Sequence, residues 1–342
     1  MDLVDELAQR RDLPDEGLRE LLSSTDEVMA AKLFKRARET TGEHFGREIY
    51  IRALIEWSNS CRNDCYYCGI RRSNRSLERY SLTEDEILQC CERAHEDGIR
   101  TFVLQGGENP AKAGELVGIV AKIRKTYPDS AITLSLGELP TELYAALREA
   151  GADRYLLRHE TATSSHYAKL HPGEMSLENR LECLKELRKL GFQTGMGMMV
   201  GSPYQTVRHL IADLRLIQSF SPEMVGTGPF IPQKDTPFGS FPAGSAETTL
   251  RLYSILRLML PEAGIPATTA LSSIIPNGHI RGIESGANVI MPNYSPLSRG
   301  KQYALYDNKS RQEFNEIKSV LNAAGYVVNP SRGDFKTKQD YV

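Results

Sequence analysis

Cysteines are scarce in this sequence, and long apolar runs are absent. Six cysteines among 342 residues are too few for a disulfide scaffold. No stretch of about 18 apolar residues occurs that could span a bilayer. The N-terminus, MDLVDELAQRRDLPDE, carries acidic residues where a secretory signal needs an apolar run. We therefore expect a cytoplasmic protein that is not embedded in a membrane.

A large excess of one charge is also absent. The 42 basic and 44 acidic residues leave a formal net charge of -2. This balance gives no electrostatic reason to expect nucleic acid or an anionic membrane as a partner. The composition, 40% apolar and 25% charged, is that of an ordinary globular protein. The length suits one large domain or two smaller ones.

A dinucleotide-binding fingerprint is missing as well. The nearest glycine-rich run, Gly195-Met-Gly197-Met-Met-Val-Gly201, spaces its last glycine wrongly for that fingerprint. This counts against a doubly wound open sheet, which is the second fold that the pattern of helices and strands would allow. No low-complexity linker divides the chain, which favours a single domain.

One local pattern recurs: an amphipathic helix, a glycine and a short apolar strand. Glycine suits the residue after a helix because it adopts the left-handed conformation without a Cβ penalty. Short, continuously apolar strands are typical of a parallel sheet covered by helices. Eight of them, alternating with helices, predict an α/β fold, a (β/α)8 TIM barrel. The expected strands are 49–56, 101–105, 131–136, 153–158, 193–199, 223–228, 266–270 and 287–291.

The predicted barrel domain covers residues 45–342, and residues 1–44 form a helical extension before it. Two helices are expected in the extension, at 14–23 and 25–43, and one helix near 310–324 follows the last strand. Capping boxes predict helix starts at Ser24 with Glu27 and at Thr83 with Glu86.

Three of the six cysteines, Cys61, Cys65 and Cys68, lie within eight residues, directly after the first predicted strand. Loops in that position form the active face of a barrel. Three thiolates spaced in this way can hold three irons of a 4Fe–4S cubane and leave the fourth iron open. Zinc would require a fourth protein ligand, and incidental burial of three cysteines is the remaining interpretation.

The spacing C-x3-C-x2-C, with the aromatic Tyr67 before the last cysteine, resembles the radical S-adenosylmethionine (SAM) superfamily. The resemblance implies one 4Fe–4S cluster whose open iron binds SAM. It also implies an external electron donor and cleavage of SAM to methionine and a 5′-deoxyadenosyl radical.

The resemblance extends to expected SAM contacts. Gln105-Gly106-Gly107-Glu108 is similar to a motif whose backbone holds the SAM amino group, and Glu160 matches a carboxylate that binds the ribose. Arg180 is expected to bind the SAM carboxylate and Met199 to line the adenine pocket. Ser135 completes the expected set. An ordinary turn, a surface ion pair and core packing are the alternative interpretations of these motifs.

Several segments resemble one subfamily, the HydE-type maturases of FeFe-hydrogenase. The segments are LSLGE, DRYLLRHETA, ENRLECL, MVGTGPFIPQKDTP, IPATTA and GANVIMPN. Biotin synthase and methylornithine synthase share this ancestry. No cysteine follows Cys183, so the accessory cluster of some members is not expected. We interpret Cys90, Cys91 and Cys183 as small buried hydrophobes.

This resemblance implies a substrate. It is a mononuclear iron complex of cysteine, CO and cyanide, received from one partner maturase and passed on to another. We expect Arg158 to offer a fixed guanidinium to an anionic group of the substrate, because an unpaired guanidinium inside a barrel is costly. The other expected substrate contacts are Thr268, Thr269, Met291, Tyr303 and Tyr306. A radical SAM mutase acting on an amino acid and a non-catalytic metal protein are the alternatives.

Overall fold

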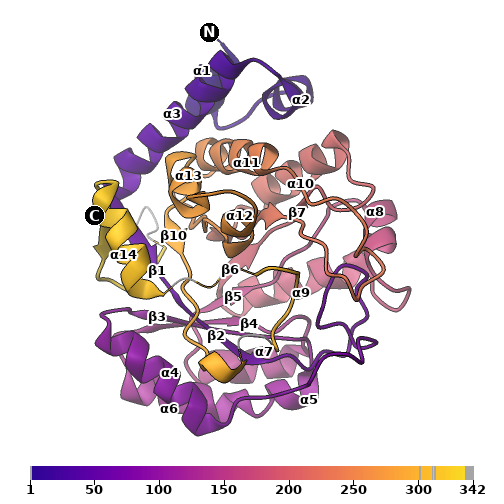
Figure 1. Ribbon diagram of the computed structural model, residues 1–342, viewed down its shortest axis with the longest axis vertical. Helices are drawn as coiled ribbons and strands as arrows, with labels where there is room; N and C mark the ends of the chain where they lie inside the picture. The colour runs from indigo at the N-terminus through magenta and orange to yellow at the C-terminus, as the bar shows by residue number, and fades with distance from the viewer. Residues whose placement is uncertain (1, 300–301, 310, 312, 336–342) are drawn as a thin grey trace.

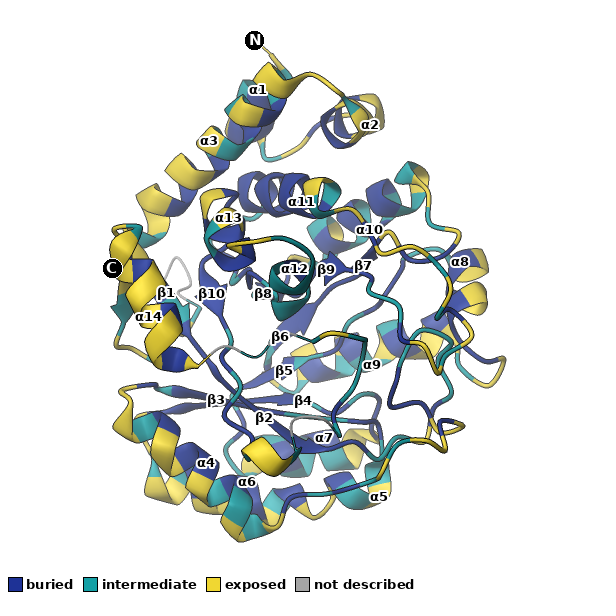
Figure 2. Cartoon of the chain, viewed as in Figure 1, coloured by how far each residue is buried: buried dark blue, intermediate teal, exposed yellow. Residues whose placement is uncertain are grey.

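A parallel sheet runs through the centre of the computed structural model, which describes residues 2–299, 302–309, 311 and 313–335 (Figure 1). The order of its six strands is β2-β3-β4-β5-β6-β8. Most of their residues are buried (Figure 2), as expected for a sheet covered by helices. The strands are β2 (Ala53–Ser58), β3 (Thr101–Gly106), β4 (Ala131–Ser135), β5 (Arg154–Leu156), β6 (Gln193–Met196) and β8 (Met224–Val225).

Single bridges and a second sheet close this sheet into a ring. Met224 bridges to Gly264, and Pro266 bridges to Val289, the first residue of β10 (Val289–Ile290). Strand β10 pairs in parallel with β1 (Glu48–Ile51), which continues after Arg52 into β2. A short pair, β7 (Met199–Val200) and β9 (Gly228–Pro229), extends β6 and β8. The predicted barrel is confirmed.

The seventh strand differs from the prediction of 266–270. Only the bridges at Gly264 and Pro266 remain of it, and helix α12 (Thr269–Ile274) begins three residues later. The cause is local: the Thr268 side chain accepts a hydrogen bond from the Leu271 amide and caps the helix, which stabilises a helix start by about 1 kcal/mol. The prediction of a strand at 268–270 is therefore wrong.

Helices surround the ring on its outer side (Figure 1). In Figure 2, α11 (Ala246–Met259) is almost wholly buried because α3 (Glu27–Phe45) packs against it. The remaining helices between the strands are α4 (Glu84–Glu96), α5 (Pro110–Ala113), α6 (Leu116–Thr126), α7 (Thr141–Glu149), α8 (Ser164–Leu170), α9 (Leu177–Lys189), α10 (Val207–Phe220) and α13 (Gly278–Glu284). A 3-10 turn spans Leu297–Arg299. No helix in the described ranges is long and apolar enough to cross a membrane.

Three helices, not two, precede the barrel. Helix α1 (Leu3–Arg10), capped by Asp2, comes before α2 (Asp15–Ser23) and α3. The expected capping box at Ser24 is wrong, because the Asp26 side chain accepts the amides of Val28 and Met29 instead. The box formed by Thr83 and Glu86 is confirmed. The division of the chain into a helical extension, residues 1–44, and a barrel domain, residues 45–342, stays a prediction.

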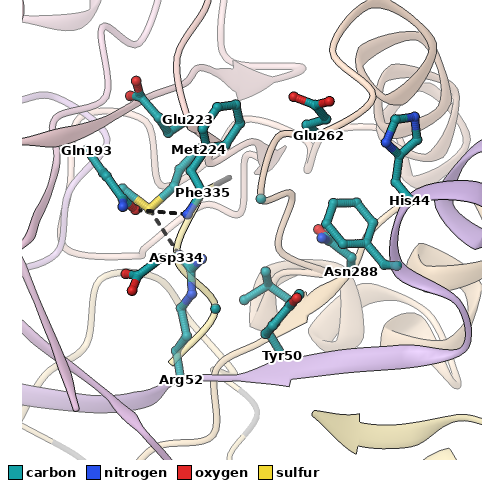
Figure 3. A pocket seen from close by; sticks show the side chains of 14 residues that line it. His44, Tyr50, Arg52, Gln193, Glu223, Met224, Glu262, Asn288, Asp334 and Phe335 are labelled. Carbon is teal, nitrogen blue, oxygen red and sulfur yellow. Dashed lines mark hydrogen bonds between the residues drawn. The ribbon is translucent and has the colours of Figure 1, made fainter. Parts of the chain in front are cut away.

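The end of the chain adds a strand to the barrel. Helix α14 (Phe314–Ala323) corresponds to the predicted helix near 310–324, of which residues 310 and 312 lie outside the described residues. Strand β11 (Val327–Asn329) pairs in parallel with β1. The chain then reaches the amino ends of the barrel strands, where Asp334 and Phe335 line a cavity with Arg52, Gln193 and Met224 (Figure 3). This cavity lies opposite the carboxyl ends of the strands.

Asp334 is expected to stabilise the fold through a buried arginine. The Arg154 side chain is fully buried, and its Nη2 lies 2.9 Å from Asp334 Oδ1. Removing one partner of such a pair leaves a buried charge partly uncompensated. Asp334→Ala should therefore lower the free energy of unfolding by about 1–3 kcal/mol, measured by urea denaturation. The exposed carboxylate Glu182 is the control: Glu182→Ala should change it by less than about 0.5 kcal/mol. Equal effects of the two substitutions would contradict the prediction.

Candidate active site

The cysteine loop, residues 61–74, follows β2 at the carboxyl end of the barrel, as predicted. Backbone hydrogen bonds attach it to distant segments. Tyr66 N donates to Leu170 O at 3.0 Å, and Gly69 N donates to Leu305 O at 2.9 Å. An ion pair of Arg71 with Asp64, 2.7 Å long, closes the loop on itself. The loop is therefore held from three sides before any ligand binds.

Arg79 binds the backbone on both sides of the three cysteines, and it was not predicted as a functional residue. Its guanidinium donates to four backbone carbonyl oxygens: Asn59 and Ile70 at 2.7 Å, Arg71 at 2.5 Å and Asn74 at 3.1 Å. Hydrogen bonds from a charged donor are about twice as strong as neutral ones. Arg79 thus fixes both ends of the segment that carries the three cysteines.

Burial raises the pKa of all three thiols in the loop. The pKa of Cys68 rises to about 12, with the neighbouring Cys61 as the second cause. The pKa of Cys65 is raised well above its usual value, again by burial and then by the other two thiols. The loop therefore concentrates three groups that cannot ionise together without a strongly positive partner. Iron ions bound by the three thiolates supply that positive charge. The donor set therefore fits a 4Fe–4S cluster.

Two glycines bring the end of β3 and the residue after it close to β2 and to the cysteine loop. A Cβ atom on Gly107 would lie 2.5 Å from Ser60 O and 2.8 Å from the Cβ of Cys61, and one on Gly106 would lie 2.3 Å from Nε1 of Trp57. Only glycine fits at either position. The backbone of the predicted SAM-amino motif is therefore placed directly against the loop. The neighbouring Gln105 side chain donates to the Tyr303 hydroxyl at 3.3 Å.

The carboxylate of Glu108 belongs to a charged network beside the loop. Glu108 Oε1 pairs with Arg62 at 2.9 Å, and Oε2 accepts the amide of Glu138 at 2.8 Å. The guanidinium of Arg180, predicted to bind the SAM carboxylate, lies 2.7 Å from Glu138 Oε1 and 3.9 Å from Glu108 Oε2. Arg180 is therefore already paired with two protein carboxylates. Ser135, the last residue of β4, is adjacent to Gln105 in the sheet register.

Glu160 and Arg158 meet at the end of β5. Arg158 Nη2 lies 2.9 Å from Glu160 Oε2, so the guanidinium that we expected to bind an anionic group of the substrate is already paired with a protein carboxylate. Glu160 has φ +66°, a left-handed conformation that strains a residue other than glycine. The Glu160 amide donates to Gly197 O at 3.0 Å, which holds this conformation. Nε of Arg158 is buried and has no hydrogen-bond partner among the described residues.

Tyr67 and Met199 lie on the other side of the loop. The Tyr67 hydroxyl donates to Nε2 of His171 at 3.1 Å. Burial, and then Arg180, lowers the pKa of His171 to about 3, so its ring is neutral and can accept this bond. Burial, and then the charge of Glu160, raises the pKa of Tyr67. Met199 is buried with Leu170, Phe230 and Phe238.

The predicted substrate residues are only partly brought together. Thr269 and Met291 line one small cavity, together with Lys309. Thr268 caps α12 and contacts the Tyr253 hydroxyl at 3.2 Å, so it is placed by a helix start and not by a strand end. Tyr303 is buried beside Lys309, whose Nζ lies 4.9 Å from the ring centre. Tyr306 is half-buried, and desolvation raises its pKa.

Glu56 was missed by the sequence reasoning. It is fully buried in β2, forms an ion pair with Lys309, and accepts a hydrogen bond from Asn293 at 2.8 Å. A signal was present: Arg52 and Glu56 interrupt the apolar run IYIRALIEWS four residues apart. Alternate residues of a strand point to the same side, so two charges at this spacing indicate a polar barrel interior.

The ring of parallel strands, with a three-cysteine loop at its carboxyl end, defines a radical SAM enzyme. Residues 55–217 match the Radical SAM superfamily. Members of this superfamily use a 4Fe–4S cluster and SAM, and both are cofactors of this enzyme. Among the described residues, no group of three or more His, Cys, Asp or Glu side chains has the geometry to hold a single metal ion.

Closer relatives define the family. The chain is 46% identical over 305 residues to the FeFe-hydrogenase maturase subunit HydE of Thermotoga maritima, covering 89% of this chain and 87% of that protein. It therefore belongs to the HydE family. It is 30% identical to 3-methylornithine synthase of Methanosarcina barkeri over 342 residues, 98% of this chain and 95% of that protein. The crystal structure of methylornithine synthase (PylB) has a TM-score of 0.87 at 27% identity, covering 96% and 97% of the two chains.

Proposed function

We propose that this enzyme matures FeFe-hydrogenase by acting on a mononuclear iron complex of cysteine, CO and cyanide. The observation that carries the proposal is at the carboxyl end of the barrel, where Gly107 packs against the cysteine loop and the pair of Arg158 and Glu160 follows β5. Membership of the HydE family supplies the class of substrate. Other hydrogenase maturases, an external electron donor and a cytoplasmic location belong to the same proposal.

In this proposal Cys61, Cys65 and Cys68 hold the cluster. When bound, the cluster supplies the electron that cleaves SAM to methionine and a 5′-deoxyadenosyl radical. Gly106 and Gly107 bring their backbone against the SAM amino group, while Gln105, Glu108, Ser135 and Arg180 line that side. Glu160 accepts hydrogen bonds from the ribose hydroxyls, and Tyr67 and Met199 flank the adenine.

The substrate would lie deeper, between Arg158 and the cavity lined by Thr269 and Met291. The unpaired Nε of Arg158 supports this placement, because a buried donor without a partner costs about 1–3 kcal/mol and an anionic ligand removes that cost. Thr268, Tyr303 and Tyr306 complete the proposed walls. Lys309 and Glu56, paired inside the barrel, add a polar boundary that the sequence did not predict.

The test is anaerobic reconstitution with iron and sulfide, followed by dithionite and SAM. Release of 5′-deoxyadenosine should rise when the iron–cysteine complex is added, and the product should support hydrogenase activation in the presence of the partner maturases. Stimulation by an amino acid and not by the iron complex would instead favour a mutase related to methylornithine synthase. Absence of 5′-deoxyadenosine under all conditions would contradict both functions.

Glu160→Gln is expected to weaken SAM binding while the cluster still assembles. A hydrogen bond to a charged group contributes about 1.5–3 kcal/mol, so the Kd for SAM should rise roughly tenfold to a hundredfold. Equilibrium binding to the reconstituted protein measures it. Glu178→Gln, on the exposed side of α9, is the control and should leave the Kd unchanged. If Glu160→Gln also leaves it unchanged, the ribose is bound elsewhere.

Arg158→Lys is expected to keep the cluster and SAM binding but lose the response to substrate. Lysine retains the charge but lacks the planar fork that can serve Glu160 and an anion at once. The measurement is 5′-deoxyadenosine release with and without the iron–cysteine complex. Arg188→Lys, on the outer surface, should behave like the wild type. If Arg158→Lys does so too, Arg158 only positions Glu160.

A further inference from the structure

We propose that the outer side of the cysteine loop is the docking surface for a small acidic protein that carries single electrons at low potential. The inference rests on the proposed function, because only an enzyme with a reducible cluster needs such an electron. We define the loop patch as the surface formed by Tyr66, Arg72, Arg75, Lys169, Tyr204, Lys234 and Phe241.

The charge of this region differs from that of the whole chain. Residues 61–80 contain five arginines and two carboxylates, a net charge of +3, while the chain carries -2. Arg71 is neutralised by Asp64, and Arg72 lies 3.5 Å from Glu174. Arg75 is exposed and forms no ion pair with any carboxylate in the described part of the chain.

Two exposed lysines extend this positive surface. Lys169, on α8, and Lys234 likewise have no carboxylate partner within the described ranges. Two carboxylates lie beside Lys234: Asp235 accepts hydrogen bonds from Ser76 and Gln233 at 3.2 Å, and Asp307 accepts the backbone amide of Lys234 at 2.9 Å. The bond from Ser76 also shows that the segment next to Lys234 lies against the segment that carries Arg75. Three cations without an ion-pair partner therefore lie near two carboxylates, which leaves the patch a net positive charge.

Aromatic rings connect the patch to the cysteine loop. Tyr66, adjacent to Cys65, lies 6.0 Å from Phe238 between ring centres, and Phe238 lies 5.2 Å from Phe241 and 6.3 Å from Tyr204. Nζ of Lys169 lies 5.0 Å from the Tyr204 ring centre. Tyr66 therefore joins the patch directly to the cysteine loop, so a protein seated on the patch contacts the segment that carries the cluster ligands.

Tyr204 is held in a costly position. Its side chain is 54% exposed, and its φ of +66° lies in the left-handed region, which is unfavourable for a bulky residue. The contacts of Tyr204 with Phe238 and Lys169 leave more than half of its side chain exposed. A partner that covers the ring would therefore bury additional apolar surface. Aromatic residues at the centre of a patch with charges at its rim are the usual anatomy of a protein interface.

The charge and the position together select the partner. Opposite charge steers a transient partner and sets its orientation, so an acidic protein is favoured. Proximity to the cluster ligands selects an electron carrier. In the step itself, the reduced carrier loses one electron and the cluster held by the three cysteines gains it. A plant-type 2Fe–2S ferredoxin, whose potential is about -400 mV, is a suitable probe because it transfers an electron alone.

The experiment compares two triple variants of the reconstituted full chain with equal changes in charge. The patch variant carries Arg75→Glu, Lys169→Glu and Lys234→Glu. The control carries Lys35→Glu, Arg38→Glu and Lys318→Glu on α3 and α14, which lie on the opposite side from α8 in Figure 1. Calorimetry gives the Kd for oxidised ferredoxin, and 5′-deoxyadenosine release is followed with reduced ferredoxin or with reduced methyl viologen. The viologen is a small cation that charge reversal does not repel.

The patch variant should bind ferredoxin at least about tenfold more weakly and lose ferredoxin-driven turnover in proportion. Turnover with viologen should stay at the wild-type level, and the control should match the wild type throughout. Raising salt from about 0.1 to about 1 M shortens the Debye length from about 10 to about 3 Å, so it should weaken binding to the wild type much more than binding to the patch variant.

An unchanged Kd in the patch variant, or an equal loss in the control, overturns the proposal. So does binding that weakens without any loss of ferredoxin-driven turnover, since the patch would then serve a partner other than the electron carrier. Failure of the proposed function is distinguishable from these results: the wild type would then release no 5′-deoxyadenosine with either reductant, while the Kd still reports on the patch.

Discussion

Replacing Cys65 by Ala should remove the 4Fe–4S cluster and abolish SAM cleavage. Three thiolates are the whole protein contribution to the cluster, so the loss of one leaves two irons without a protein ligand. Cys65 lies in the middle of the loop, and burial and the neighbouring thiols raise its pKa well above the usual value. A site that unfavourable for thiolates forms only when iron binds to all three. The same loss is expected for Cys61→Ala and Cys68→Ala.

The measurement is iron per chain after anaerobic reconstitution, together with the electron paramagnetic resonance signal after reduction. Iron should fall from about four atoms per chain to near zero. Cys183→Ala is the matched control: Cys183 lies on α9, and a hydrogen bond with Tyr144 contributes to its pKa. That variant should keep the iron and the signal. A Cys65→Ala variant that still cleaved SAM would overturn the assignment of the loop.

The barrel and the cysteine loop could be predicted from sequence because both depend on local patterns. Short apolar strands, each preceded by a helix and a glycine, define a parallel sheet without any knowledge of tertiary contacts. The loop is recognised from the spacing of Cys61, Cys65 and Cys68 and from its position after a strand. Its place at the carboxyl end of the ring then follows from the topology of the fold alone.

The misplaced elements show where local patterns fail. The residues 266–270 follow a helix and a glycine, as the true strands do, yet the Thr268 side chain starts a helix and ends the strand. Strand β11 has little burial of its own, and only its pairing with β1, about 280 residues earlier in the chain, defines it. Periodicity within one segment carries no information about such pairings.

The pairing of Arg158 with Glu160 illustrates a different limit. The expected partner of Arg158 is an anionic group of the substrate, whereas its guanidinium already pairs with Glu160. Glu160 has a left-handed conformation, which is held by the carbonyl of Gly197 between β6 and β7. A backbone conformation held by a distant segment cannot be inferred from a tripeptide, so the sequence did not show that Arg158 has a protein partner.

Arg79 is the clearest functional residue that sequence reasoning could not find. An arginine eleven residues after Cys68 looks like any surface cation. Its role follows only from the folded loop, where four carbonyl oxygens from Asn59 to Asn74 converge on one guanidinium. Because no carboxylate in the described part of the chain pairs with it, Arg79 also leaves a positive charge near the thiols and favours their ionised form.

Arg79→Met should therefore prevent stable assembly of the cluster in a protein that still folds. Four hydrogen bonds from a charged donor are lost, each typically contributing about 1.5–3 kcal/mol, and the freed carbonyls turn to water only if the loop opens. Circular dichroism should show an intact barrel, while iron per chain falls severalfold. Arg79→Lys separates charge from geometry: lysine keeps the charge but has three donors and no planar fork, so iron retention should be intermediate.

Arg72 offers the matched control for this prediction. It lies in the same loop, is exposed, and makes one ion pair of 3.5 Å with Glu174, which contributes less than about 1 kcal/mol. Arg72→Met should retain the full iron content and the same rate of SAM cleavage with dithionite. If Arg79→Met also retains them, the four carbonyl contacts are incidental. The loop would then owe its shape to the backbone hydrogen bonds at Tyr66 and Gly69 and to the ion pair of Arg71 with Asp64.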